Sequence, residues 1–369
     1  MIEAIVFIMV LSVLILSHEW GHFIAAKLSK MRVDEFGLGF PPNLFKFKKG
    51  DTEYSINLIP FGGFVKIHGE DEEKKATPET DPDFNRRFSS RPKLSQAFVI
   101  IAGVLFNFLF AWLLFSIGFM SGFPTAVTDA NESFIQNKHI VITSVLPNSP
   151  ASGALLSPGA RIVGLFNGKE EVIPKNVGQI SSFIEKETGP FTIKIQEGEN
   201  EVKEISITAR EGLIEGKKAI GITMDQIGTL SLSPHRAVFF GFTRTINLIE
   251  LTAKGIAGLL RDAITGKAGF DSVSGPIGIY TLVGEATRFG FVYLLGFTAV
   301  ISISLGVINL VPFPALDGGR LLFLIIEAIK GSPIKPIVAT TFNYVGFVIL
   351  IVLMILISYG DLLKLGVFN

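Results

Sequence analysis

Four long apolar stretches constrain the fold of this chain more than any other feature of its sequence. They cover residues 5–28, 97–120, 292–311 and 337–358. Each reaches the roughly 20 residues that an α-helix needs to cross a hydrocarbon layer of about 30 Å. Because lipid offers no hydrogen-bonding partner to a peptide group, chain that crosses it must satisfy its own backbone, as a helix does. The sequence therefore predicts a polytopic α-helical membrane protein with four transmembrane helices.

The composition agrees with a membrane location and excludes several classes of function. Hydrophobic residues make up 48% of the chain, and 33 basic residues balance 33 acidic ones, so no net field favours nucleic acid as a partner. The chain has no cysteine, which excludes disulfides, thiolate metal ligands and a cysteine nucleophile. Histidine and carboxylate side chains remain as the metal ligands that this sequence offers.

Basic residues predict the orientation of the chain in the membrane. Twelve Lys and Arg lie in residues 29–96, and none precedes the first apolar stretch. Because Lys and Arg concentrate on the cytoplasmic side, residues 29–96 are predicted to be cytoplasmic and the N-terminus outside. Four crossings then place residues 123–291 outside, 320–335 inside and the C-terminus outside. The first stretch is interpreted as a helix and not as a signal peptide, since it lacks both a basic flank and a small-residue cleavage site.

The first apolar stretch contains a His-Glu-x-x-His motif formed by His18, Glu19 and His22. Residues four apart share one face of a helix, so both imidazoles can reach a single metal ion while Glu19 points toward a bound water. The motif is short, and a polar helix end near the headgroups is the alternative. However, three ionisable side chains in a membrane helix are costly unless they face a cavity and bind something. The motif therefore favours a zinc hydrolase.

A catalytic zinc normally has three protein ligands, so a third ligand must come from elsewhere in the chain. Asp317 follows Pro312 and Pro314, which interrupt a helix, and irregular chain at membrane depth is tolerated only where it lines a cavity. Asp317 is therefore the predicted third ligand, with a simple helix end before Gly318 and Gly319 as the alternative. The other histidines are predicted to lie in the cytoplasmic segment or on the far side of the membrane: His68, His139 and His235.

The cytoplasmic segment is predicted to contain a membrane-associated β-hairpin near the metal. Strand-like runs cover residues 52–58 and 64–68, and Gly62 and Gly63 lie between them. A hairpin with a purely structural role is the alternative. The charged residues that follow, 70–83, are predicted to form a solvated loop without chemistry.

A soluble module of about 100 residues, 127–226, separates the second and third apolar stretches. Its pattern between Pro147 and Gly168 resembles a PDZ domain of the bacterial protease type, a fold that accepts an extended peptide by strand addition. Apolar residues then recur every three or four positions from Phe242 to Ile264, which predicts an amphipathic helix on the outer membrane face or against the module, or an ordinary connecting helix. The predicted strands of the module are 141–146, 161–166, 191–196 and 201–209, with a helix at 177–186.

The order of these motifs resembles the site-2 protease family of intramembrane zinc metalloproteases, in its bacterial RseP-like group. The matching segments are His18 to His22, Phe61 to Lys66 with Gly69 and Glu70, Gly103 to Asn107, the single PDZ-like insertion, Ser274 to Gly278, and Asn309 to Arg320. The resemblance implies Zn²⁺ as cofactor, held by His18, His22 and Asp317, and Glu19 as general base. It also implies that Asn309 hydrogen-bonds the substrate backbone and that Asn107 faces the same region. The hairpin edge with Gly62, Gly63, Phe64 and Val65 is predicted, from its glycine-flanked strand, to hold the unwound substrate by strand pairing.

The resemblance further implies regulated intramembrane proteolysis in the bacterial cytoplasmic (inner) membrane. The expected partners are the bilayer, single-span membrane proteins such as anti-sigma factors or signal-peptide remnants, and a peptide ligand of the PDZ domain. A membrane scaffold without proteolysis and a metal transporter are the alternatives. The predicted domains are transmembrane helices at 1–28, 97–122, 291–320 and 321–369 (with the C-terminus), a cytoplasmic loop at 29–96, the extracytoplasmic PDZ-like domain at 123–230, and an amphipathic extracytoplasmic segment at 231–290.

Overall fold

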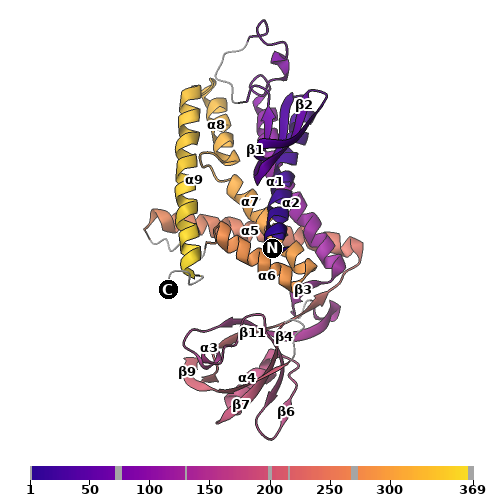
Figure 1. Ribbon diagram of the computed structural model, residues 1–369, viewed down its shortest axis with the longest axis vertical. Helices are drawn as coiled ribbons and strands as arrows, with labels where there is room; N and C mark the ends of the chain where they lie inside the picture. The colour runs from indigo at the N-terminus through magenta and orange to yellow at the C-terminus, as the bar shows by residue number, and fades with distance from the viewer. Residues whose placement is uncertain are drawn as a thin grey trace. The chain divides into compact units, whose positions relative to one another are not determined.

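The computed structural model describes residues 2–70, 77–128, 131–197, 202–214, 217–266 and 273–364 (Figure 1). The chain forms two compact units. Residues Gly118–Ala237 make up the smaller unit, and the chain on either side of this segment makes up the larger one. The larger unit contains the first apolar stretch and the Asp317 segment.

Four helices of the larger unit are long and apolar enough to cross a membrane, which confirms the predicted number of spans among the described residues. The third ends earlier than predicted, at Asn309 and not at Val311. The four candidate spans are α1 (Ile2–Leu28), α2 (Lys93–Ser121), α7 (Phe291–Asn309) and α9 (Pro336–Lys364). The other long helices are α5 (Pro234–Ile264), α6 (Pro276–Phe289) and α8 (Asp317–Lys330).

Helix α8 corrects the prediction of a short connection between the third and fourth spans. Asp317 is its first residue, so the carboxylate starts a new helix and does not lie at the end of a broken one. The apolar residues of α8 fall on one face, and Leu324 is buried. With 14 residues the helix is shorter than a membrane span, so the apolar content alone did not reveal it.

Helix α6 was not predicted, because it lies in the segment interpreted as a single amphipathic element. It packs against α1, α7 and α9, and its Val283 is fully buried beside Leu14 of α1. Asp361 of α9 accepts hydrogen bonds from the backbone N–H groups of Gly275 (2.9 Å) and Gly278 (2.8 Å). A carboxylate placed at the first turn of a helix stabilises otherwise unpaired N–H groups, so Asp361 ties α9 to the start of α6.

The predicted hairpin is larger than expected. Strand β1 (Val33–Lys49) was not predicted, and β2 (Thr52–Ile67) joins the two predicted runs into one strand. The first half of β1 pairs on both sides: Phe36, for example, pairs with Tyr54 and also with Val65. As a result, the segment 63–67 forms one edge of the sheet. Within the described residues it pairs with β1 alone.

The predicted solvated loop is in part an ion-pair network. Asp81 accepts a hydrogen bond from Arg87 at 2.7 Å and lies 2.9 Å from the His68 ring. The Arg87 guanidinium lowers the pKa of the Asp81 carboxyl to about 2. The short helix η1 (Phe84–Arg86) lies within this network, and residues 71–76 of the predicted loop lie outside the described residues.

The smaller unit contains a seven-stranded sheet with the strand order β3-β11-β4-β5-β7-β8, in which β6 pairs with β5, and a two-stranded sheet of β9 and β10. The helix predicted at 177–186 and the strand predicted at 161–166 are confirmed with those bounds. Ile180 of the helix packs among Ile142, Leu165 and Ile193 in the core. The elements are β3 (Phe123–Ala126), η2 (Glu132–Phe134), β4 (Ile135–Val145), α3 (Pro150–Gly153), β5 (Arg161–Phe166), β6 (Glu171–Val172), α4 (Val177–Lys186), β7 (Pro190–Gln196), β8 (Lys203–Thr208), β9 (Arg210–Ile214), β10 (Lys217–Ala219) and β11 (Ile222–Leu230).

Candidate metal centre

The backbone of α2 lies directly against the His-Glu-x-x-His turn of α1. A Cβ atom added to Gly21 would collide with the carbonyl oxygen of Ala102, so only glycine permits this approach. The approach brings the Val99 carbonyl oxygen within 2.9 Å of His22 Nδ1. Because a carbonyl only accepts, Nδ1 must carry the proton, which leaves the lone pair of a neutral His22 on Nε2. A backbone partner of this kind orients a metal-binding histidine.

Asp317 is presented by a tight turn that α9 holds in place. The chain folds back so closely that a Cβ on Gly318 would collide with the carbonyl oxygens of the turn. Ala315 adopts a left-handed conformation (φ 67°), and its N–H donates to Asn343 Oδ1 of α9 at 3.3 Å. One turn further along α9, Gly346 lies against Pro314 with no room for a Cβ. The position of Asp317 therefore depends on α9 as well as on its own segment.

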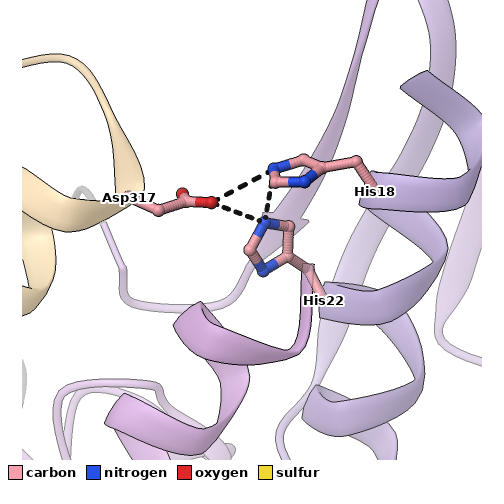
Figure 2. Close-up of side chains that lie close together, drawn as sticks. All are labelled: His18, His22 and Asp317. Atoms are coloured by element: carbon pink, nitrogen blue, oxygen red, sulfur yellow. Dashed lines mark hydrogen bonds and ion pairs between the residues drawn. The ribbon is translucent and has the colours of Figure 1, made fainter. Parts of the chain in front are cut away.

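The side chains of His18, His22 and Asp317 point toward one another (Figure 2). Asp317 Oδ2 lies 3.1 Å from His18 Nε2 and 3.4 Å from His22 Nε2, and the two Nε2 atoms are 3.1 Å apart. A tetrahedral zinc ion with bonds of about 2.0–2.1 Å would hold its ligand atoms about 3.3 Å apart. Among the described residues, this is the only cluster of three or more metal-ligand side chains.

The chemistry of these three atoms also fits a cation. Asp317 Oδ2 is buried and accepts no hydrogen bond, although two ring nitrogens are near. When His22 is neutral, its lone pair lies on Nε2, for the reason given above. Lone pairs on neighbouring nitrogen and oxygen atoms repel at this distance unless a positive charge lies between them. The three residues could therefore hold a divalent metal and leave a fourth position open.

A cavity of about 1540 Å³ adjoins the three side chains. The predicted site residues Glu19, Asn309, Gly63, Phe64 and Val65 all line it. The structure thus brings together five of the predicted residues with the candidate ligands, from α1, α7 and the edge of the hairpin.

Gly63 lies beside the predicted general base. A Cβ on Gly63 would be 3.2 Å from Glu19 Cγ and would collide with Ile15. A glycine therefore allows β2 to pass across α1 at this point, so the backbone of the hairpin edge borders the half-buried Glu19 side chain.

Two predicted substrate-binding residues are not part of the cavity lining. Gly62 adopts φ 131° at a bend of β2, where a Cβ would collide with the Phe40 ring. Asn107 is fully buried on α2, with its amide 3.2 Å from His18 Nδ1.

The sequence interpretation missed a polar face on α9. Thr340, Asn343 and Tyr344 line the cavity from this helix. Their spacing of three and four places them on one face of an otherwise apolar span, and polar residues so placed are a functional signal in a membrane helix. Arg320 of α8 also lines the cavity and pairs with Glu70 at 2.5 Å. This contact holds α8 near the end of the hairpin.

Comparison with known proteins decides the family. The family model described as peptidase family M50 matches residues 6–353, so it includes both His18 and Asp317. The chain belongs to peptidase family M50. The sequence-based assignment to the site-2 type of zinc metalloprotease is thereby confirmed.

Several curated relatives match this M50 peptidase over almost their whole length. It is 29% identical to the zinc metalloprotease RasP of Oceanobacillus iheyensis, over 99% of this chain and 100% of that protein. It is also 29% identical to the regulator of sigma-W protease RasP of Bacillus subtilis, over 98% of each chain. A putative zinc metalloprotease of Clostridium perfringens is 34% identical, over 95% of this chain and 96% of the relative.

Proposed function

We propose that this M50 peptidase is a zinc metalloprotease that cleaves single-span membrane proteins within the bilayer. The observation that carries the proposal is the convergence of His18, His22 and Asp317 beside membrane-length helices and a large cavity. These three residues would hold Zn²⁺, which when bound supplies Lewis-acid chemistry for peptide hydrolysis. Irregular backbone, such as the turn before Asp317, is tolerated at membrane depth where it borders a cavity of this kind.

Glu19 is the general base in this proposal. It accepts the proton of the attacking water and delivers it to the leaving amine of the cleaved peptide bond. Its place on α1, one residue from His18 and bordering the cavity, supports this role. Asn309 is the last residue of α7 and lines the same cavity, and it forms a hydrogen bond with the substrate backbone.

The hairpin edge, residues 63–67, holds the substrate in an extended conformation. A transmembrane helix shields its own carbonyls, so it must unwind locally before hydrolysis. An open strand edge replaces the hydrogen bonds that unwinding removes. Three observations support this role: the segment pairs with β1 on one side only, it lines the cavity, and its Gly63 borders Glu19.

Proline substitutions test the hairpin role. Backbone N–H groups alternate in direction along a strand. One of the two variants Phe64→Pro and Val65→Pro therefore removes an N–H that faces the cavity, and the other removes an N–H that faces away from it. We expect the variant that lacks the cavity-facing N–H to lose about tenfold in cleavage, the value of one hydrogen bond, while its zinc content stays unchanged. Lys48→Pro, on the opposite edge of the sheet, is the matched control. Wild-type cleavage by both edge variants would contradict strand pairing.

The smaller unit and the substrates complete the proposal. The unit at 123–230 is a PDZ-like domain outside the cytoplasm that admits substrates whose external part is already trimmed, or binds their peptide ends. Residues 29–96 and the active site face the cytoplasm at the bacterial inner membrane, as the basic residues of that segment indicate. The substrates are anti-sigma factors or signal-peptide remnants. The name of the Bacillus subtilis relative, a regulator of sigma-W, supports the former.

Removal of zinc tests the proposed function. The purified protein should contain about one zinc per chain, lose cleavage of a membrane-spanning model peptide on chelation, and regain it with added zinc. Chelation should also lower the thermal stability, because a bound ligand at 1,000 times its Kd stabilises a folded protein by about 4 kcal/mol. A scaffold would bind peptide without cleavage in either state. A transporter would carry zinc across vesicles without cleaving anything, and either result would overturn the proposal.

A further inference from the structure

Asn107 has an environment that differs from that of the cavity residues. Its side chain is fully buried on α2 and lies outside the cavity lining. Two hydroxyl groups hold the backbone at this point of α2: Ser302 Oγ of α7 donates to the Asn107 carbonyl at 2.8 Å, and Ser17 Oγ of α1 donates to the Phe106 carbonyl at 3.3 Å. Three helices therefore fix the position of this amide.

The Asn107 amide faces His18 from the side opposite to the candidate metal position. It lies 3.2 Å from His18 Nδ1, whereas His18 Nε2 faces Asp317 and His22. The amide nitrogen lies toward the His18 ring, and Asn107 Oδ1 is then buried without a hydrogen-bond partner. The nitrogen and oxygen of an amide have nearly the same shape, so their assignment follows from the hydrogen bonds that each orientation makes.

The chemistry of the ligand set selects the reverse orientation. His18 can offer an Nε2 lone pair to a metal only if Nδ1 carries the proton. A protonated Nδ1 requires an acceptor, and Asn107 Oδ1 is the acceptor within reach once the amide is rotated. His22 has the same arrangement with a different acceptor, the Val99 carbonyl oxygen. Both histidines then have a partner from α2 on the nitrogen that faces away from Asp317.

We propose that Asn107 is a positioning residue, whose amide oxygen accepts the Nδ1–H of His18 and holds the Nε2 lone pair toward the metal. This inference rests on the proposed function, since it concerns the same zinc centre. It replaces the predicted contact of Asn107 with substrate. Partners of this kind raise the metal affinity of a histidine, and their loss typically costs about 10- to 100-fold in affinity.

The wild-type protein provides the first test. Nitrogen NMR of zinc-loaded protein labelled with ¹⁵N-histidine, in detergent, reports which ring nitrogen carries the proton. The signals of His18 are assigned by their absence in His18→Gln. We expect the Nδ1–H form for His18. An Nε2–H form with an unprotonated Nδ1 would overturn the proposal, whatever the activity of the protein.

Variants supply the second test, read as zinc affinity by competition with a chelator. Asn107→Leu should weaken zinc binding about 10- to 100-fold. Asn107→Asp, which keeps an acceptor but loses the amide donor, should recover most of that affinity. Ser302→Ala removes the hydrogen bond to the Asn107 carbonyl and keeps the amide, so it controls for packing. A raised KM with unchanged zinc affinity in Asn107→Leu would overturn the inference in favour of a substrate contact.

Failure of this inference can be told apart from failure of the proposed function. If the wild-type protein binds zinc and cleaves the model peptide but Asn107→Leu has wild-type zinc affinity, the role of Asn107 is wrong and the protease remains. If the wild-type protein binds no zinc, the proposed function fails, whichever histidine nitrogen is protonated.

Discussion

Glu19→Gln is expected to reduce cleavage of a membrane-spanning peptide by about a hundredfold to ten-thousandfold, the usual contribution of a general base. Glutamine keeps the shape of the side chain but has no basic oxygen that could take a proton from water. Glu19 is also not one of the three convergent ligand side chains. The variant should therefore keep its zinc, and the loss should appear in kcat with little change in KM.

The measurement compares zinc content and peptide cleavage in the variant and the wild type. Glu3→Gln is the matched control, because Glu3 lies on the same helix but pairs with Arg288 at 2.8 Å, away from the cavity. It should cleave at the wild-type rate. If Glu19→Gln retained full activity with bound zinc, the proton would have to be transferred by another group, and the assignment of Glu19 would be wrong.

The second large effect is expected at Gly103, a residue of α2 that carries no functional group. A Cβ at this position would collide with the His22 ring and lie 2.9 Å from His18 Cε1. Gly103→Ala should therefore displace both imidazoles. Because functional side chains must be held to about 0.5 Å, zinc affinity should fall by about 100-fold or more, and cleavage should be lost with it.

Gly360→Ala is the matched control for this substitution. Gly360 also lies in a membrane-length helix, but a Cβ there meets nothing within 4 Å. Zinc binding should be unchanged. The free energy of unfolding should rise slightly, because alanine stabilises a helix by up to about 1 kcal/mol relative to glycine. Zinc affinity is measured by chelator competition and stability by thermal unfolding. Wild-type zinc affinity in Gly103→Ala would show that the histidines do not depend on close contact with α2.

The fold was predictable from the sequence where one segment carried the signal by itself. The four spans and helix α4 are recognisable because the apolar content or periodicity of a single segment identifies them. Strand β1 was missed because Pro41, Pro42 and several charged residues obscure its alternation. Its first half is nevertheless a strand, because it has a pairing partner on each side. Helix α6 was missed for a similar reason, since it is too short for a span and takes its stability from its neighbours.

The sequence by itself identified the side chains that the structure brings together in the candidate centre. His18, Glu19 and His22 are identifiable because ionisable groups are costly in an apolar helix, and Asp317 because a helix that contains two prolines cannot continue. These signals are local, so no knowledge of the fold was needed to detect them.

Only the tertiary structure decided how those residues are held. Three contacts between segments far apart in the chain hold them. The Val99 carbonyl orients His22, α2 approaches closely at Gly21 and Gly103, and α9 contacts the turn before Asp317. Every residue has a carbonyl, and many glycines have no close neighbour. A particular carbonyl or glycine becomes important only when another segment packs closely against it, and the sequence of one segment does not show which segment that is.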